Sequence, residues 1–212
     1  MFEINSVEIK NINDFKKIIE KDISIVKTFK YENLFKLIIR TYNIYMYTSM
    51  HGTPEMLKYL ETYLSDIKDF KDENNNDSYL IAVNNGNLEV MKYLEKEHNW
   101  DIHIKNNSGM DAYLSASLYG QLEIMKYLEK ECNWDINVKS NSGDDVYLCA
   151  IVKGNLEIMK YLEKEHNWYK YFTYNYVLFA YKLASRFKQT EIIKYLENKD
   201  VVYEIYFTPL HN

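Results

Sequence analysis

The sequence is poor in cysteine and proline, and it lacks an excess of basic residues. Only two cysteines, Cys132 and Cys149, and two prolines occur in 212 residues. A small secreted scaffold needs a dense framework of paired cysteines, so we expect free thiols in a reducing compartment. Lysine and arginine total 26 against 31 aspartates and glutamates, which gives a net charge of −5. We therefore expect no nucleic-acid partner, because such binders need a basic face to displace phosphate counterions.

Long apolar segments and a leader sequence are also missing. Residues 1–10 contain Glu3 and Glu8 and no apolar run, which is unlike a signal peptide. The longest apolar-rich stretch free of charge, residues 171–181, is too short to cross about 30 Å of hydrocarbon. Hydrophobic residues make up 47% and charged residues 27%, a balance that excludes a disordered chain. These features predict an intracellular, cytoplasmic protein without a membrane partner, and they leave the nucleus open.

The sequence does contain a tandem repeat of 34 residues. The string Tyr-Leu-Glu begins at Tyr59, Tyr93, Tyr127, Tyr161 and Tyr195. Three further columns keep the same step: Tyr45, Tyr79, Tyr113, Tyr147 and Tyr181; Thr48, Ala82, Ala116, Ala150 and Ala184; and Gly52, Gly86, Gly120, Gly154 and then Lys188. A fixed period of this length indicates a repeat architecture. The chain length equals 42 residues plus five units of 34.

Each unit is predicted to form two short helices and an extended loop. Asp111 can cap a first helix, and Gly120 tolerates the left-handed turn that ends it. The second helix then begins at Gln121 and carries apolar residues at helical spacing. In the first unit, Thr53 and Pro54 are expected to provide a hydroxyl cap and a proline at the first helical position. Such short helices bury their apolar faces only by stacking against neighbouring copies.

The repeat resembles the ankyrin-repeat family. Residues 154–162, with the sequence Gly-Asn-Leu-Glu-Ile-Met-Lys-Tyr-Leu, are similar to the family's second helix. Residues 145–150 follow the pattern Asp-x-Tyr-Leu-x-Ala and occupy the place of the family's Thr-Pro-Leu-His-x-Ala. The resemblance implies an all-α, ankyrin-type helical solenoid of about five 34-residue helix-turn-helix repeats with terminal caps. Leucine replaces the family's histidine, so the resemblance does not carry over the usual polar network between repeats. The 34-residue form is also similar to ankyrin proteins of giant DNA viruses such as mimivirus, which implies a viral host-interaction role.

The resemblance also predicts three regions. Residues 1–42 are expected to form a helical N-terminal cap or a degenerate repeat, with helices near residues 13–21 and 32–40. Residues 43–200 form the ankyrin-type array, and residues 201–212 form a C-terminal tail. Within that tail, Thr208 to His211 looks like the start of another first helix, but it lies out of register, and we interpret it as coincidence or a remnant.

Candidate chemical sites have simpler structural interpretations. His98, Cys132 and His166 share a column, but helices packed about 8–10 Å apart hold equivalent side chains too far apart to share one zinc ion. The tryptophans at 100, 134 and 168 are expected to pack under the loops. Asp145 is assigned to helix capping rather than to acid–base catalysis. We therefore predict a protein that is not an enzyme and that has no catalytic residues, metal or cofactor.

The predicted function is protein binding through the concave face of the array by a monomer. The candidate contact residues are the loop-tip and first-helix positions that vary between copies: Asn74, Asn76, Asn84, Asn85, Asn107, Ser108, Met110, Leu118, Tyr119, Asn141, Ser142, Asp144, Val152 and Lys153. Aromatic residues at 169–176 are either a partner anchor or an extra hydrophobic cap, and the cap is favoured. Two alternatives stay open: a structural or virion-associated component that self-assembles through its stack ends, and an adaptor for a ubiquitin ligase.

Overall fold

The computed structural model describes residues 2–4, 7–9, 13–17, 19–20, 44–62 and 71–198. The chain divides into two compact units, residues 1–107 and residues 108–212. Each unit is described by itself. The predicted helix at residues 32–40, the tail at 201–212 and Thr208 to His211 lie outside the described residues.

Unit 1 begins with a short hairpin that the sequence analysis did not predict. Strands β1 (Phe2–Ile4) and β2 (Val7–Ile9) pair antiparallel, with Glu3 opposite Glu8. Residues 13–17 and 19–20 are helical, with Phe15 and Ile19 buried, in the segment where a helix was expected. Helical residues 44–51 precede α3 (Pro54–Glu61), and α4 (Ser78–Asn84) precedes α5 (Leu88–His98).

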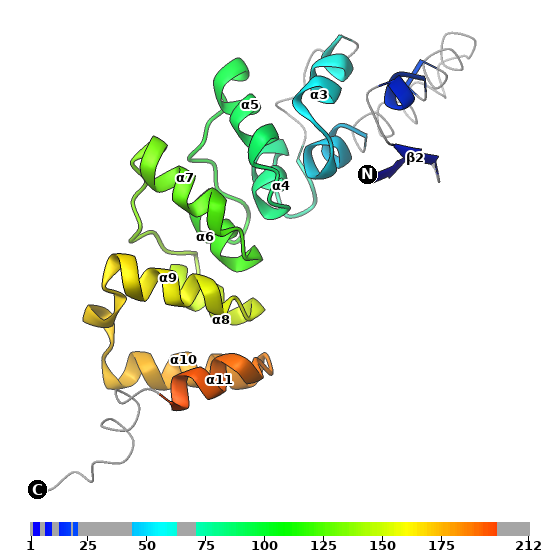
Figure 1. Cartoon of the computed structure of the whole chain (residues 1–212). Helices are drawn as coiled ribbons and strands as arrows, with labels where there is room; N and C mark the ends of the chain where they lie inside the picture. The colour runs from blue at the N-terminus through cyan, green and yellow to red at the C-terminus, as the bar shows by residue number, and fades with distance from the viewer. Residues whose placement is uncertain are drawn as a thin grey trace, which may run out of the picture. The chain divides into compact units, whose positions relative to one another are not determined.

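Unit 2 contains three consecutive helix pairs. They are α6 (Ala112–Tyr119) with α7 (Leu122–Cys132), α8 (Val146–Lys153) with α9 (Leu156–His166), and α10 (Tyr174–Arg186) with α11 (Thr190–Glu197). A 3₁₀ turn, η2 (Trp168–Tyr171), lies between α9 and α10. Helix α8 packs against both α6 and α10, so the first helices of successive repeats form one layer (Figure 1).

The helix ends follow the predicted capping pattern with one exception. Asp111 and Asp145 each accept hydrogen bonds from two backbone N–H groups at the start of α6 and α8. Gly120 and Gly154 end those helices at φ values of 79° and 83°. Lys188 takes the same left-handed conformation, with a φ of 56°, where the last repeat has lost its glycine. Thr53 stands at the N-cap of α3, but its hydroxyl makes no capping bond, so that part of the prediction was wrong.

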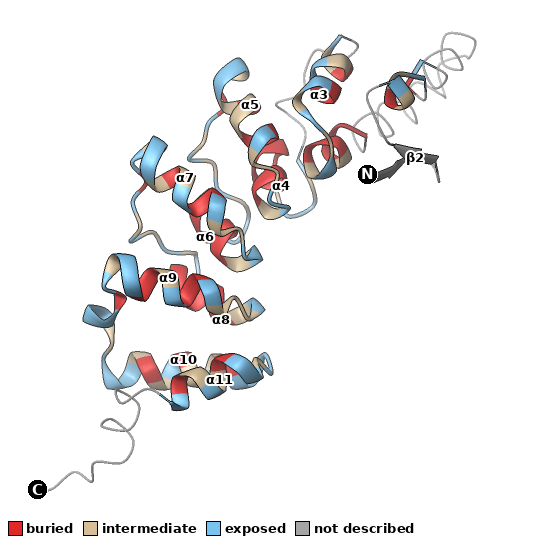
Figure 2. Ribbon diagram, in the orientation of Figure 1, coloured by how far each residue is buried: buried red, intermediate tan, exposed pale blue. Residues whose placement is uncertain are grey.

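The core of each unit lies between the helices, where the apolar side chains of both helix types are buried (Figure 2). Tyr79, Tyr113 and Tyr147 are fully buried, as are the methionines Met91, Met125 and Met159 of the second helices. The three tryptophans are also buried, as the prediction that they pack inside the fold requires.

The last repeat departs from this pattern on its first helix, α10. Leu148 and Ile151 of α8 are buried, whereas the residues 34 positions later, Lys182 and Ser185 of α10, are polar and exposed. At these positions α10 therefore has polar, exposed side chains, whereas α8 has apolar side chains that are buried.

A repeat-binding face on a hydrogen-bonded framework

Neighbouring repeats are joined by a cluster of tyrosine, glutamate and histidine side chains. In unit 2, Glu129 of α7 accepts a 2.6 Å hydrogen bond from Tyr113 Oη of α6 and another of 2.6 Å from Tyr161 Oη of α9. His166 Nε2 lies 3.1 Å from the same carboxylate. We call this arrangement the tyrosine–glutamate clasp. It connects three helices from two repeats and provides an inter-repeat polar network that the family's histidine does not provide here.

The clasp recurs in both units. Glu163 accepts from Tyr147, Tyr169 and Tyr195, at 2.7, 3.1 and 2.5 Å. In unit 1, Glu61 accepts from Tyr45 at 3.0 Å and Tyr93 at 2.6 Å, and His98 Nε2 lies 3.0 Å away. Hydrogen bonds to a charged acceptor are roughly twice as strong as neutral ones. The histidine column therefore has a structural part in the clasp at Glu61 and Glu129.

Burial keeps the clasp tyrosines in their donating form. Burial raises the pKa of Tyr113 well above its ordinary value, and the neighbouring Glu129 carboxylate raises it further. Tyr147 shows the same direction for the same reasons, with Glu163 as the carboxylate. The raised pKa favours the protonated form of both phenols, which is the form that donates a hydrogen bond.

A second link uses the amides at the starts of the second helices. Asn155 Nδ2 donates 2.8 Å hydrogen bonds to the carbonyls of Ser117 and Leu118, which lie at the end of α6. Gln189 Nε2 donates 2.8 Å to the carbonyl of Val152. These carbonyls are among those that a helix leaves unpaired at its C-terminus. The amide column was predicted to start helices, and its role in binding the preceding repeat was missed.

The loop tips approach one another closely. In unit 2, Asn141 N–H donates 3.0 Å to the carbonyl of Ser108, and in unit 1 Asn107 N–H donates 3.0 Å to the carbonyl of Asn74. Gly109 has a φ of 72°, and a Cβ at that position would collide with the Asn141 side chain and backbone. Only glycine can adopt the positive φ and also leave room for Asn141 without strain.

The aromatic segment after α9 divides into buried and exposed members. Phe172 packs edge-on against Tyr147, with ring centroids 5.3 Å apart, and Tyr176 Oη donates to both oxygens of Asp145 at 2.9 and 3.0 Å. Tyr169, Tyr171 and Tyr174 remain 42%, 37% and 52% exposed. Part of this segment therefore covers the core of unit 2, as a hydrophobic cap would, and part of it faces solvent.

The predicted contact residues do not all reach the surface. Asn76 is buried, and its Nδ2 donates 2.9 Å to Asp72, while Met110 is buried beneath its loop. Neither side chain is available to a partner. Asn84, Leu118, Asp144 and Val152 are half-buried, and the exposed members are Asn74, Asn85, Asn107, Ser108, Tyr119, Asn141, Ser142 and Lys153.

Two of these residues, Tyr119 and Lys153, come together on the first helices of unit 2. Tyr119 is 46% exposed, and Lys153 Nζ lies 6.0 Å from the centre of its ring. The next residue in this column is Phe187, which is 43% exposed and has the Arg186 guanidinium 5.8 Å from its ring. Sequence reasoning missed Arg186 and Phe187, although the 34-residue step from Val152 and Lys153 points directly to them. We define the first-helix face by Leu118, Tyr119, Val152, Lys153, Arg186 and Phe187.

The rest of the described structure offers no metal centre or spanning helix. Within the described ranges, no group of three or more histidine, cysteine, aspartate or glutamate side chains could hold a metal ion. Over the same residues, no helix is long and apolar enough to cross a bilayer. Cys149 is buried, and burial, helped by the nearby aspartates, raises the pKa of its thiol to about 12.

Comparison with known proteins agrees with this architecture. The family described as ankyrin repeats (3 copies) matches residues 44–140 and 80–171, which together cover more than half of the chain. The chain belongs to the ankyrin-repeat family. No curated protein matches the sequence.

Solved structures show the same fold. A chain in the crystal structure of the yeast ribosomal protein Rps3 in complex with its chaperone Yar1 is 23% identical, with a TM-score of 0.50. The match covers 58% of the present chain and 91% of the yeast one. Ankyrin repeats generally mediate contacts between proteins, and family members are typically not enzymes. The exposed residues of the repeats are therefore the candidates for a binding site.

Proposed function

We propose that this chain is a non-enzymatic binding module that holds a partner protein on its first-helix face. The observation that carries the proposal is the pair Tyr119 and Lys153, exposed side by side on helices that are joined by hydrogen bonds between repeats. Tyrosine is enriched among the residues that dominate binding energy at protein interfaces, and a cation near its ring is attracted to the ring face. Because the clasps and amide links fix the helices, little conformational entropy is lost when a partner binds.

The setting of this activity rests on the resemblance to ankyrin proteins of giant viruses. We propose that the chain acts in the host cytoplasm, as a viral host-interaction factor and as a monomer. The exposed Lys182 and Ser185 on α10 support the monomer, because they oppose the addition of a further repeat or a second copy at this end. The same two residues weigh against the alternative of a self-assembling structural component.

Affinity capture tests the proposal. The full chain, the double variant Tyr119→Ser/Lys153→Ser and the control Lys130→Ser/Lys164→Ser are each used as bait in the same host-cell lysate. The control substitutes two exposed lysines of α7 and α9. We expect a protein that the wild type and the control capture equally and the face variant loses. A partner that all three baits retain, or that both variants lose, would place the binding site elsewhere.

A further inference from the structure

Charge is segregated between the two helix layers of unit 2. The first helices α6, α8 and α10 contain no aspartate or glutamate, although the whole chain carries a net charge of −5. Their charged residues are Lys153, Lys182 and Arg186, all exposed, and Lys188 follows directly after α10. The capping Asp111 and Asp145 before α6 and α8 are buried, and their carboxylates bind backbone N–H groups.

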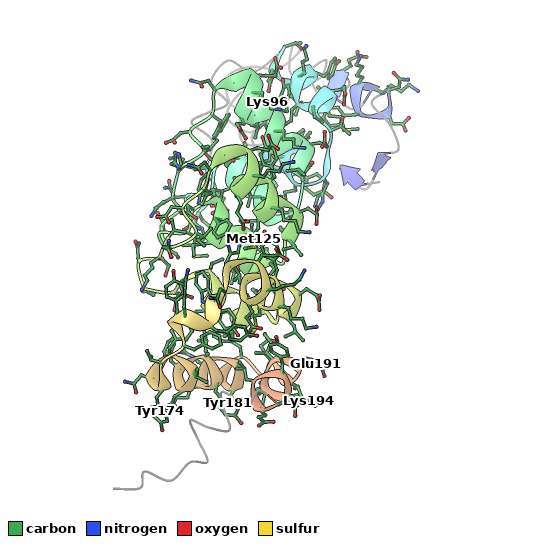
Figure 3. The ribbon with its side chains drawn as sticks, turned by 60° about the vertical axis from the view of Figure 1, so that its left-hand side comes forward. Lys96, Met125, Tyr174, Tyr181, Glu191 and Lys194 are labelled. Carbon is green, nitrogen blue, oxygen red and sulfur yellow. The ribbon has the colours of Figure 1, made fainter. Side chains whose placement is uncertain are left out.

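The acidic residues of unit 2 lie mainly on the second helices, and several of them are paired there with lysines. Glu123 lies 2.7 Å from Lys126, Glu157 lies 2.8 Å from Lys160, and Glu191 lies 3.5 Å from Lys194. Figure 3 shows the last pair on α11. These surface pairs are weak, but each carboxylate has a cation on its own helix. The exposed Asp135 and the half-buried Asp144 belong to the connecting loops.

The first-helix face therefore combines cations with apolar rings. Lys153 is near the ring of Tyr119, and Arg186 is near the ring of Phe187, and the four residues come from two adjacent repeat columns. Leu118 and Val152 add half-buried aliphatic surface beside them. A ligand that fits must bring negative charge to the cations and apolar side chains to the rings.

We propose that the first-helix face of unit 2 binds an acidic, extended peptide segment of the partner, one that alternates carboxylates with apolar residues. This inference rests on the proposed function and adds the chemistry of the partner. Three helices spaced about 10 Å apart span about 20 Å, which roughly six extended residues cover. Carboxylates can pair with Lys153 and Arg186 while neighbouring apolar side chains contact Tyr119 and Phe187. Arginine and carboxylate also match in geometry, since two parallel hydrogen bonds can form.

Selection from a random peptide library tests the inference. The immobilised full chain selects from displayed peptides of about twelve residues, twice the expected span. We expect enrichment of peptides rich in aspartate and glutamate with interspersed apolar residues. A selected peptide, labelled with fluorescein, is then titrated with three proteins: wild type, Lys153→Glu/Arg186→Glu and the control Lys130→Glu/Lys164→Glu.

The variants carry the same change in net charge and differ only in where it lies. We expect the face variant to weaken binding on the order of tenfold or more, the control to bind as the wild type does, and added salt to weaken the wild type. The inference is overturned if basic or uncharged peptides are selected, if no peptide is enriched, or if both variants lose the same affinity. Tighter binding of a thymidine oligonucleotide of equal length would also overturn it, in favour of nucleic acid. If lysate capture still depends on Tyr119 and Lys153 in those cases, the proposed function stands and only the acidic segment is rejected.

Discussion

Individual side chains in this protein carry more than one structural bond. Glu129 serves two tyrosines and a histidine, and Asp145 caps α8 while it accepts from Tyr176. This sharing of acceptors partly explains the high tyrosine content of the sequence, because the tyrosines of two repeat columns donate hydrogen bonds to the glutamates of one column. Removing a shared acceptor leaves several donors without their partner, so such residues have larger effects than their size suggests.

Replacing Glu129 with glutamine should destabilise unit 2. The neutral amide has one acceptor oxygen where the carboxylate has two, so Tyr113 or Tyr161 loses its charged acceptor. We expect a loss of about 1–3 kcal/mol in the free energy of unfolding, measured by urea denaturation. Glu131→Gln, on an exposed residue of the same helix, is the control and should change little. Equal effects of the two substitutions would contradict a special role for the clasp.

Asp145 should give stability a pH dependence of a definite sign. Burial raises its pKa from the ordinary 3.8, although backbone hydrogen bonds and Tyr176 partly oppose this. Between 3.8 and the raised value the folded chain binds more protons than the unfolded chain, so this group's contribution to stability falls as pH rises through that window. Asp145→Asn keeps a good helix cap and removes the titration. The difference in unfolding free energy between the wild type and Asp145→Asn should shift against the wild type with rising pH.

At the scale of elements, short helices and loops are positioned by their neighbours rather than by their own propensity. Helices of eight residues such as α6 and α8 are marginal alone. Asn155 and Gln189 tie helix ends across repeats, and the loop tips pair through backbone hydrogen bonds. The 34-residue period predicted the helices and most caps, but it gave no sign of which side chains cross between repeats.

Alanine substitutions at the two loop-tip glycines can distinguish the cost of backbone strain from the cost of a steric clash. Gly109 and Gly143 both have positive φ, at 72° and 84°, but a Cβ at 109 would meet Asn141 while a Cβ at 143 would meet nothing within 4 Å. We expect Gly143→Ala to cost about 1 kcal/mol from backbone strain alone, and Gly109→Ala to cost clearly more. Thermal unfolding of the two variants measures the difference. A larger effect at 143 would show that the loop tips are not in close contact.

At the scale of the whole molecule, the last repeat differs from the internal repeats in which first-helix side chains are polar and exposed. The buried Leu148 and Ile151 of α8 give way to Lys182 and Ser185 in α10, where no further helix pair is described beside them. The Tyr-Leu-Glu column continues unchanged through Tyr195, so the second helix alone does not reveal this difference.

Restoring the internal pattern at α10 should create an adhesive surface. The double variant Lys182→Leu/Ser185→Ile places on α10 the residues that α8 has at the equivalent positions. The added apolar side chains would face solvent, whereas in α8 they are buried against a neighbouring repeat. We expect concentration-dependent self-association in size-exclusion chromatography with light scattering. Lys164→Leu/Glu165→Ile on α9 adds similar apolar area outside the repeat interface and serves as the control. A monomeric Lys182→Leu/Ser185→Ile chain would argue that these positions do not govern stacking.

The sequence by itself determined the repeat, its period, the helix pairs, the aspartate caps and the burial of the tryptophans. Periodic apolar columns specify which faces must be buried, and that information is local to each copy. Tertiary structure decided the rest: Asn76 and Met110 are buried, Lys153 lies near the ring of Tyr119, and one glutamate column accepts hydrogen bonds from two tyrosine columns. These outcomes depend on contacts between residues 16 to 38 positions apart, which exist only when one repeat packs on the next.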